Sequence, residues 1–292
     1  MKRPFTSVEK FIDQKAHAFL DRLPRHGLSA GGVEFLVFGL KQAWACLFGA
    51  AMLGLLLGTH FFYPENVPLR RYDFLFLASL AIQITMIVGR LETNGEVKVI
   101  LIYHLIGTVM ELFKTHVGSW VYPEENFFRI GGVPLFSGFM YAAVGSYIAR
   151  IHRLFDIKYS HYPVFWATIV LCFGIYANFF THHYIWDFRW VLFAATITIY
   201  FRCWVHFRVF RYRHKMPLLV GFFLVALFIW FAENIGTYSR AWLYPSQMSG
   251  WAPVSPSKLG AWYLLMIISY VLVTLVNRPQ PLEPGTDGPG RS

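Results

Sequence analysis

Apolar residues gather in eight runs along the chain, separated by short polar segments. The runs cover about residues 33–59, 72–89, 98–118, 132–150, 162–181, 188–207, 217–237 and 258–277. Each contains about 18–27 residues, which is long enough for a helix to cross a hydrocarbon core of about 30 Å. The pattern therefore predicts an all-α, polytopic membrane protein with about eight transmembrane helices.

The two ends of the chain differ from these runs. Thr6 and Glu9 have the spacing of a helix capping box, and apolar residues then recur at helical spacing as far as Pro24. Residues 1–30 are thus expected to form a basic amphipathic helix on the membrane surface. Residues 278–292 are rich in Pro and Gly and are expected to be a disordered tail.

The distribution of charge predicts the orientation of the chain. Hydrophobic residues make up 56% of the sequence and charged residues only 14%, and the net charge is +10. If the N-terminus is cytoplasmic, the inner segments carry 16 Lys and Arg residues and the outer segments seven. This bias predicts that both termini face the cytoplasm, and it accounts for the positive charge without nucleic acid as a partner.

Two stretches of the sequence match each other without a gap. ELFKTHVGSWVYPE begins at Glu111 and ENIGTYSRAWLYPS begins at Glu233, 122 residues later, and the same offset aligns further residues on both sides of the phrase. A constant offset indicates an internal duplication. We predict two four-helix repeats, residues 31–155 and 156–277, in parallel orientation because each has an even number of spans.

The polar residues inside the apolar runs are the candidates for function. Glu111 and Glu233 lie near the middle of the third and seventh runs, and intramembrane carboxylates are costly and usually mark a site. They are the predicted catalytic pair. The predicted substrate-binding residues are His60, Lys114, Thr115, His116, Trp120, Tyr122, His182, Thr237, Arg240, Trp242 and Tyr244.

Structural explanations compete with this prediction. Lys114 could neutralise Glu111 within one helix, Arg240 could do the same for Glu233, and the aromatic residues could be interface anchors. A metal site is a further alternative, but its residues lack a typical metal-binding spacing: His60, His116, His182 and His183 with Glu65, Glu124 and Asp187. We predict no metal and no cofactor.

The stretch from Glu111 to Tyr141, ELFKTHVGSWVYPEENFFRIGGVPLFSGFMY, resembles the uncharacterised bacterial membrane-protein family typed by YoaT. The resemblance implies a multi-pass protein of the bacterial cytoplasmic membrane and brings no known activity. A weaker similarity, at Glu111, Gly118, Trp120 and Tyr122, is to membrane carotenoid hydratases and lycopene cyclases, and it implies a lipid-like substrate.

Three functions fit these features. The favoured hypothesis is an intramembrane enzyme whose paired glutamates act as acid and base on a lipid or isoprenoid. The alternative is a transporter or channel for a small solute or ion with the carboxylates as its coupling site, although the polar residues gather on the outer half of the spans. The third is a non-catalytic membrane scaffold. In each case membrane lipids are the expected surroundings.

Overall fold

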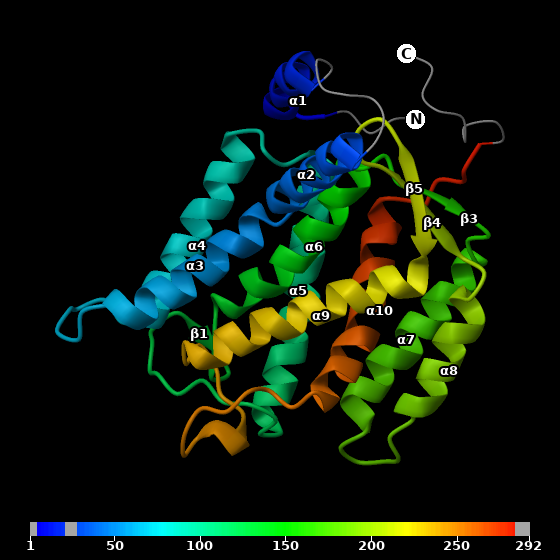
Figure 1. Cartoon of the computed structure of the whole chain (residues 1–292). Coiled ribbons are helices and arrows are strands. Elements are labelled where there is room, and N and C mark those ends of the chain that lie inside the picture. The colour runs from blue at the N-terminus through cyan, green and yellow to red at the C-terminus, as the bar shows by residue number, and fades with distance from the viewer. Residues whose placement is uncertain (1–4, 21–27, 284–292) are drawn as a thin grey trace.

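The computed structural model describes residues 5–20 and 28–283 of the chain, and most of them are helical (Figure 1). The helices are α1 (Ser7–Leu20), α2 (Leu28–Ala45), α3 (Leu47–Phe62), α4 (Arg71–Val88), α5 (Asn94–His116), α6 (Ser137–Leu154), α7 (Phe165–Thr181), α8 (Arg189–Tyr200), α9 (Leu218–Tyr238) and α10 (Ser257–Val276), with a 3-10 turn at Pro245–Gln247. The strands are β1 (Arg129–Ile130), β2 (Val133–Pro134), β3 (Lys158–Ser160), β4 (Trp204–Arg208) and β5 (Arg213–Pro217).

The helices form one body with different structures at its two ends. α1 and the antiparallel sheet β3-β4-β5 lie at one end, which we call the sheet end, and the chain segments that follow α5 and α9 lie at the opposite end, the turn end (Figure 1). The main core cluster draws on α5, α6, α7, α9 and α10 and so extends from the N-terminal to the C-terminal half of the chain.

Several helices in the N-terminal and C-terminal halves of the chain that stand about 122 residues apart have similar neighbours. Shifted by 122 residues, α5 would cover residues 216–238 and α6 residues 259–276, which are nearly the bounds of α9 and α10. α3 contacts α4 and α6 as α7 contacts α8 and α10, and α5 packs on α6 as α9 packs on α10. α2 has no counterpart in this correspondence.

Glycines allow α5 and α6 to pack closely. A Cβ atom added at Gly107 would lie 2.7 Å from the ring of Tyr141, and one added at Gly145 would lie 2.8 Å from the ring of Tyr103. Tyr103 is buried and donates a hydrogen bond to the carbonyl of Ser269 on α10. The aromatic rings of one helix thus occupy the space that small residues leave on the other.

The number of candidate membrane spans is lower than the sequence predicted. Among the described helices three are long and apolar enough to cross a membrane, namely α4, α9 and α10, or four if α2 and α3, which meet at a 65° bend, form one broken span. The prediction of eight spans is therefore not confirmed. α7 and α8 have only 17 and 12 residues, and α5 carries four charged side chains.

Two further predictions are corrected. The chain is not purely helical, because residues 204–207 at the end of the sixth apolar run form β4 together with Arg208 instead of continuing a helix. The segment from Arg278 is not disordered throughout: Gln280 and Leu282 form backbone hydrogen bonds with Tyr159 of β3, both of 2.9 Å. Residues 284–292 lie outside the described part.

The predicted capping box of α1 is confirmed, and its glutamate also docks the helix. The backbone N–H of Thr6 donates to Glu9, and that of Glu9 donates to the Thr6 hydroxyl. The Glu9 carboxylate is buried and accepts hydrogen bonds from Arg153 and Trp44. Arg153 also pairs with Glu96, the capping-box glutamate of α5, so one guanidinium joins the starts of two helices.

We expect Gly145→Ala to destabilise the protein by about 1–3 kcal/mol, because the methyl group would overpack the buried Tyr103 ring. Thermal unfolding of the detergent-purified protein measures this as a lower midpoint. Gly54→Ala in α3 is the matched control, since nothing lies within 4 Å of its added Cβ and alanine favours the helix. Equal midpoints for the two variants would contradict the described α5–α6 contact.

Candidate functional site

Glu111 is buried near the turn end of α5 and is surrounded by aromatic donors. Its side chain accepts hydrogen bonds from the Trp120 indole (2.8 Å), the Tyr122 hydroxyl (2.7 Å) and the Tyr141 hydroxyl (2.7 Å). Glu111 is only 3% exposed, so water cannot replace these donors. A buried carboxylate needs such bonds, because an unsatisfied one would cost far more than they contribute.

Glu233 occupies the corresponding place in α9 and is also 3% exposed. It accepts hydrogen bonds from the hydroxyl of Tyr244 and from the indole of Trp262, the latter at 2.5 Å. Tyr244 stands 122 residues after Tyr122, so this donor is common to both halves. The indole donor differs: Trp242, the counterpart of Trp120, lies against Gly236, and Trp262 of α10 reaches Glu233 instead.

The two carboxylate sites meet at a short antiparallel contact between the halves. Val121 and Leu243 exchange two backbone hydrogen bonds, each of 2.9 Å, and the two residues are themselves 122 positions apart. Next to this bridge, the Trp120 and Tyr244 rings pack edge to face with centroids 6.3 Å apart. A donor of Glu111 therefore touches a donor of Glu233.

The turns after α5 and α9 have the same backbone geometry but different residues at one position. Gly118 has φ of +70° and its counterpart Arg240 has φ of +56°. In both turns the residue in this conformation ends the helix in the same hydrogen-bonded motif. The bonds are Gly118 N to Thr115 O, Ser119 N to Lys114 O, Arg240 N to Thr237 O and Ala241 N to Gly236 O. A glycine adopts this conformation freely, whereas a non-glycine residue there costs about 1–3 kcal/mol.

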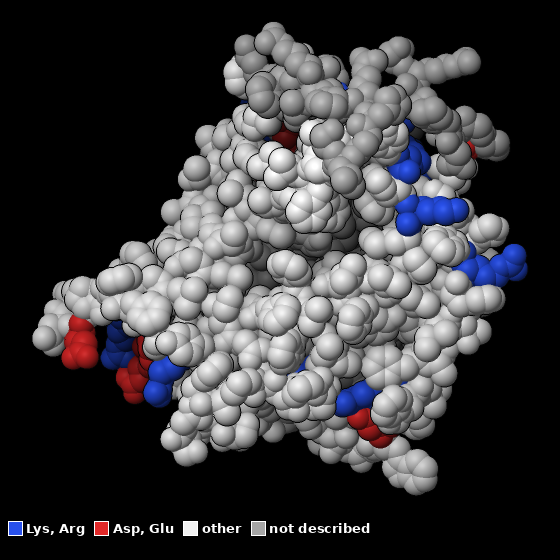
Figure 2. Space-filling view, in the orientation of Figure 1, with Lys and Arg blue, Asp and Glu red and all other residues white. Residues whose placement is uncertain are grey.

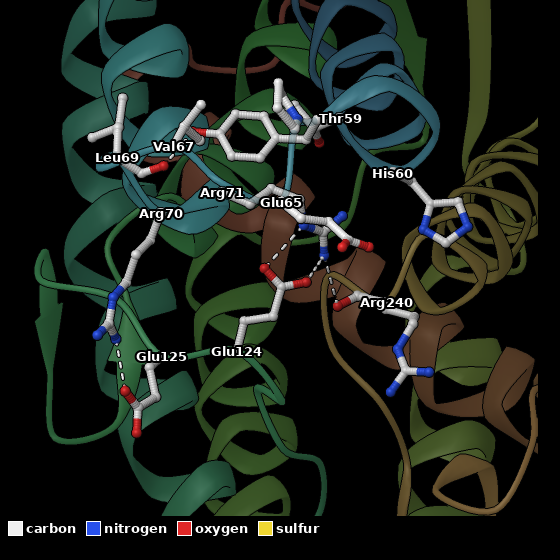
Figure 3. Close-up of a pocket in the computed structure, with 12 residues that line it drawn as sticks. Thr59, His60, Glu65, Val67, Leu69, Arg70, Arg71, Glu124, Glu125 and Arg240 are labelled. Carbon is white, nitrogen blue, oxygen red and sulfur yellow. Dashed lines mark hydrogen bonds and ion pairs between the residues drawn. The ribbon is translucent and has the colours of Figure 1, made fainter.

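A pocket with a volume of about 520 Å³ lies at the turn end (Figure 3). We call it the Arg240 pocket. Two ion pairs line it: Arg71 with Glu124, at 2.5 Å, and Arg70 with Glu125, at 2.7 Å. Its lining residues are Thr59, His60, Tyr63, Pro64, Glu65, Val67, Leu69, Arg70, Arg71, Glu124, Glu125 and Arg240.

Contacts connect this pocket to Glu111. Arg71 donates to the backbone carbonyls of Ser239 (2.9 Å) and Arg240 (3.1 Å), and the neighbouring Tyr72 hydroxyl donates to the Arg240 carbonyl (3.0 Å). The Tyr72 ring packs edge to face on Tyr122, which binds Glu111. The wall of the pocket is thus one aromatic contact away from the donors of the buried carboxylate.

Several predicted site residues lie away from both carboxylates. Lys114 contacts His183 at 2.8 Å and the Phe179 ring, and it forms no ion pair with Glu111. Partial desolvation of the His183 ring and the nearby Lys114 charge lower the pKa of His183, so its neutral ring accepts a hydrogen bond from Lys114. His116 is exposed, and His182 packs on His183.

Of the remaining candidates, two line the Arg240 pocket and two lie elsewhere at the turn end. His60 and Arg240 line the pocket, and Arg240 forms no ion pair with Glu233 among the described residues. The Thr237 hydroxyl accepts a hydrogen bond from Trp251, while Thr115 is only partly exposed. Within the described ranges no group of three or more His, Cys, Asp and Glu residues could hold a metal ion.

The structure adds three residues that the sequence did not single out. Tyr141 and Trp262 reach the carboxylates from α6 and α10, the helices that follow each turn. Arg71 joins Glu124 to the carbonyls at the end of α9. The 122-residue offset aligns Tyr141 with Tyr263, but it gives no sign that only Tyr141 points to a glutamate.

These features define the chain as a mostly helical protein with several apolar helices and two buried, aromatic-bound carboxylates. Residues 34–270 match the model of the family described as protein of unknown function (DUF817), and the chain belongs to that family. It is similar to the uncharacterized protein YoaT of Bacillus subtilis (strain 168), with 42% identity over 86% of this chain and 94% of that protein. No solved structure matches.

The family match confirms the resemblance to the YoaT family. The weaker similarity to carotenoid hydratases and lycopene cyclases finds no support in these matches and stays a prediction.

We expect Tyr141→Phe to destabilise the protein by about 1.5–3 kcal/mol, the usual contribution of a hydrogen bond to a charged group. Tyr263→Phe is the matched control, since it makes the same change at the corresponding position and no described residue hydrogen-bonds to its hydroxyl. Thermal unfolding should give a lower midpoint for Tyr141→Phe only. Equal midpoints would show that the Tyr141 bond to Glu111 contributes nothing.

Proposed function

We propose that this chain is a multi-pass protein of the bacterial cytoplasmic membrane, built from two similar four-helix halves in parallel orientation with both termini inside. We further propose that it carries a small polar solute across that membrane, with Glu111 and Glu233 as the groups that couple transport to protons. The observation that carries this proposal is the placement of the two buried carboxylates on either side of the contact between the halves.

The surface of the molecule supports a membrane location. Large apolar side chains are exposed along several helices, among them Phe35, Leu101, Phe173 and Phe228. In Figure 2 the charged side chains of the described residues gather toward the two ends of the body and leave the middle of this face uncharged. Such an exposed apolar band is too extensive for ordinary contact with water.

The matching contacts of α3–α6 and α7–α10 support the two similar halves. The antiparallel bridge between Val121 and Leu243 adds to this, because two equivalent residues that exchange both hydrogen bonds are related by local twofold symmetry. A site between parallel repeats would lie at such an axis, as in transporters built from repeated halves.

A change in the proton state of Glu111 would change its hydrogen bonds. The ionised carboxylate only accepts hydrogen bonds, and it receives all three donors described above. A protonated carboxyl group must also donate, so one tyrosine hydroxyl would have to turn from donor to acceptor. Trp120 has no acceptor capacity and would keep its role. Proton binding would thereby rearrange the turn that bridges to the other half.

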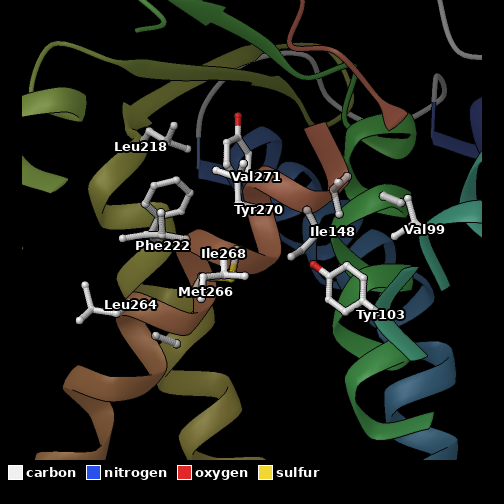
Figure 4. Packing of buried hydrophobic residues seen from close by; sticks show 14 of the residues in the cluster. Val99, Tyr103, Ile148, Leu218, Phe222, Leu264, Met266, Ile268, Tyr270 and Val271 are labelled. Atoms are coloured by element: carbon white, nitrogen blue, oxygen red, sulfur yellow. The ribbon is translucent and has the colours of Figure 1, made fainter. Parts of the chain in front are cut away.

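The sequence indicated that polar residues gather on the outer half of the spans. The sheet end, which the proposed orientation places on the inner side, also contains buried polar groups. His152 and the Tyr159 hydroxyl lie 2.6 Å apart, the rings of Tyr162 and Tyr270 pack on Tyr159, and Tyr200 packs on Tyr162. Tyr270 lies beside Phe222 in the core between α9 and α10 (Figure 4). A cluster of buried hydroxyl groups favours passage of a polar solute or proton over a purely structural role.

An intramembrane enzyme acting on a lipid or isoprenoid is the second candidate. The aromatic rings of Trp120, Tyr122 and Tyr141 around Glu111 favour it, because such rings stabilise a cation that an acid generates on a carbon–carbon double bond. The charged lining of the Arg240 pocket favours the polar solute.

Proteoliposomes that contain a pH-sensitive dye test the transport proposal. We expect addition of α-amino acids, small carboxylates or small amines to change the internal pH for at least one solute, and Glu111→Gln and Glu233→Gln to reduce that change at least tenfold. Tyr263→Phe, which leaves both carboxylates and their donors intact, should transport normally. Folded glutamine variants with undiminished proton movement would contradict the proposal.

The enzyme is tested by comparing the membrane lipids of a deletion strain complemented with the wild type or with Glu111→Gln. A lipid that accumulates in the deletion strain and in the Glu111→Gln strain, without proton movement in vesicles, would favour the enzyme over the transporter.

A further inference from the structure

We propose that the Arg240 pocket binds a small zwitterion with one carboxylate and one amine, of the α-amino acid type. This inference rests on the proposed transport function and names the class of solute and the place where it first binds. Three features of the molecule support it: the backbone conformation at Arg240, the charged side chains of the pocket that have no partner in the described part of the chain, and the volume of the pocket together with the elements that line it.

The first observation is that an arginine stands where the backbone favours glycine. The corresponding turn of the other half has Gly118 in the same left-handed conformation, and a Cβ at that position would meet nothing within 4 Å. Space therefore does not require glycine, and backbone conformation alone disfavours arginine. An unfavourable residue at a pocket points to a use of its side chain.

The second observation is the balance of charges in the pocket. Arg71 is paired with Glu124, and Arg70 with Glu125. Among the described residues, the Arg240 guanidinium and the Glu65 carboxylate have no hydrogen bond or ion pair with another side chain. Both line the pocket (Figure 3), and both side chains are exposed. The pocket thus presents one positive and one negative side chain that have no partner among the described residues.

These two groups select for a ligand that carries both charges. A guanidinium binds a carboxylate through two parallel hydrogen bonds, and the Glu65 carboxylate would bind an ammonium group. A simple anion would be repelled by Glu65, and a simple amine would be repelled by Arg240. A zwitterion satisfies both side chains at once.

The size and the walls of the pocket fit this class of ligand. Its volume of about 520 Å³ lies within the usual range for small-molecule sites, about 300–1,000 Å³. The walls come from the end of α3, the start of α4 and the segment after α5, while Arg240 comes from the end of α9. A ligand held there touches both halves, and Arg71 and Tyr72 connect its site to Tyr122 and Glu111.

Calorimetry on the detergent-purified full chain tests this site with the common α-amino acids and, for each, the matched acid without the amine and the matched amine without the carboxylate. We expect at least one amino acid to bind at least tenfold more tightly than both of its analogues. Failure of every amino acid to bind, or equal binding of the matched acid, would overturn the proposal.

Two variants assign the contacts. Arg240→Gly should abolish amino acid binding and leave the unliganded melting temperature unchanged or higher, because glycine suits the turn. Glu65→Gln should weaken amino acid binding at least tenfold and strengthen binding of the matched acid. Arg189→Gln is the control, since Arg189 pairs with Asp187 outside the pocket and should bind like the wild type. Wild-type binding by Arg240→Gly would overturn the proposal.

The two proposals can fail separately. Amino acid binding that requires Arg240, without solute or proton movement in vesicles, would contradict the transport function and leave the binding site standing. Transport that requires Glu111 and Glu233 but is unchanged in Arg240→Gly would contradict the binding site and leave the transport function standing.

Discussion

The need to satisfy two buried carboxylates governs the turn end of the structure. Glu111 and Glu233 are shielded from water, so their hydrogen-bond donors must come from the protein. The donors that bind them all lie outside α5 and α9. The chain therefore turns back after α5 and after α9, and Tyr122 and Tyr244 reach the carboxylates from these turns.

The position of these turns follows from that requirement. Each turn must cross over the end of its own helix, and the two turns then meet at Val121 and Leu243. Their bridge lies next to the contact between Trp120 and Tyr244, which are donors of the two glutamates. Any rearrangement of the donors, whether by proton binding or by a ligand in the Arg240 pocket, would act on this bridge. The proposed coupling therefore needs no long path through the protein.

Some of this arrangement can be read from the sequence. The offset of 122 residues picks out Glu111, Glu233 and the paired tyrosines Tyr122 and Tyr244, because a repeated phrase preserves local spacing. Tyr141 and Trp262 were missed, because they reach the glutamates from the following helices and only the packing of those helices brings them close. The direction of Lys114, toward His183 instead of Glu111, depends on α7 in the same way.

The errors in the predicted fold have a similar cause. The run at residues 188–207 is mostly apolar, and hydropathy alone does not separate a helix from a strand. The structure ends α8 at Tyr200 and pairs residues 204–208 with β3 and β5, a long-range choice that a local pattern does not contain. Likewise, the Pro-rich segment from Arg278 is held by long-range contacts, among them its pairing with Tyr159.

The direct test of the account is a disulfide across the bridge between the halves. In an antiparallel pair that exchanges both hydrogen bonds, the Cα atoms lie about 5.5 Å apart, within reach of a disulfide. We predict that the protein with both Val121→Cys and Leu243→Cys forms this crosslink under mild oxidation, as detected by mass spectrometry of its peptides. Absence of the crosslink, with both thiols accessible to reagents, would contradict the account.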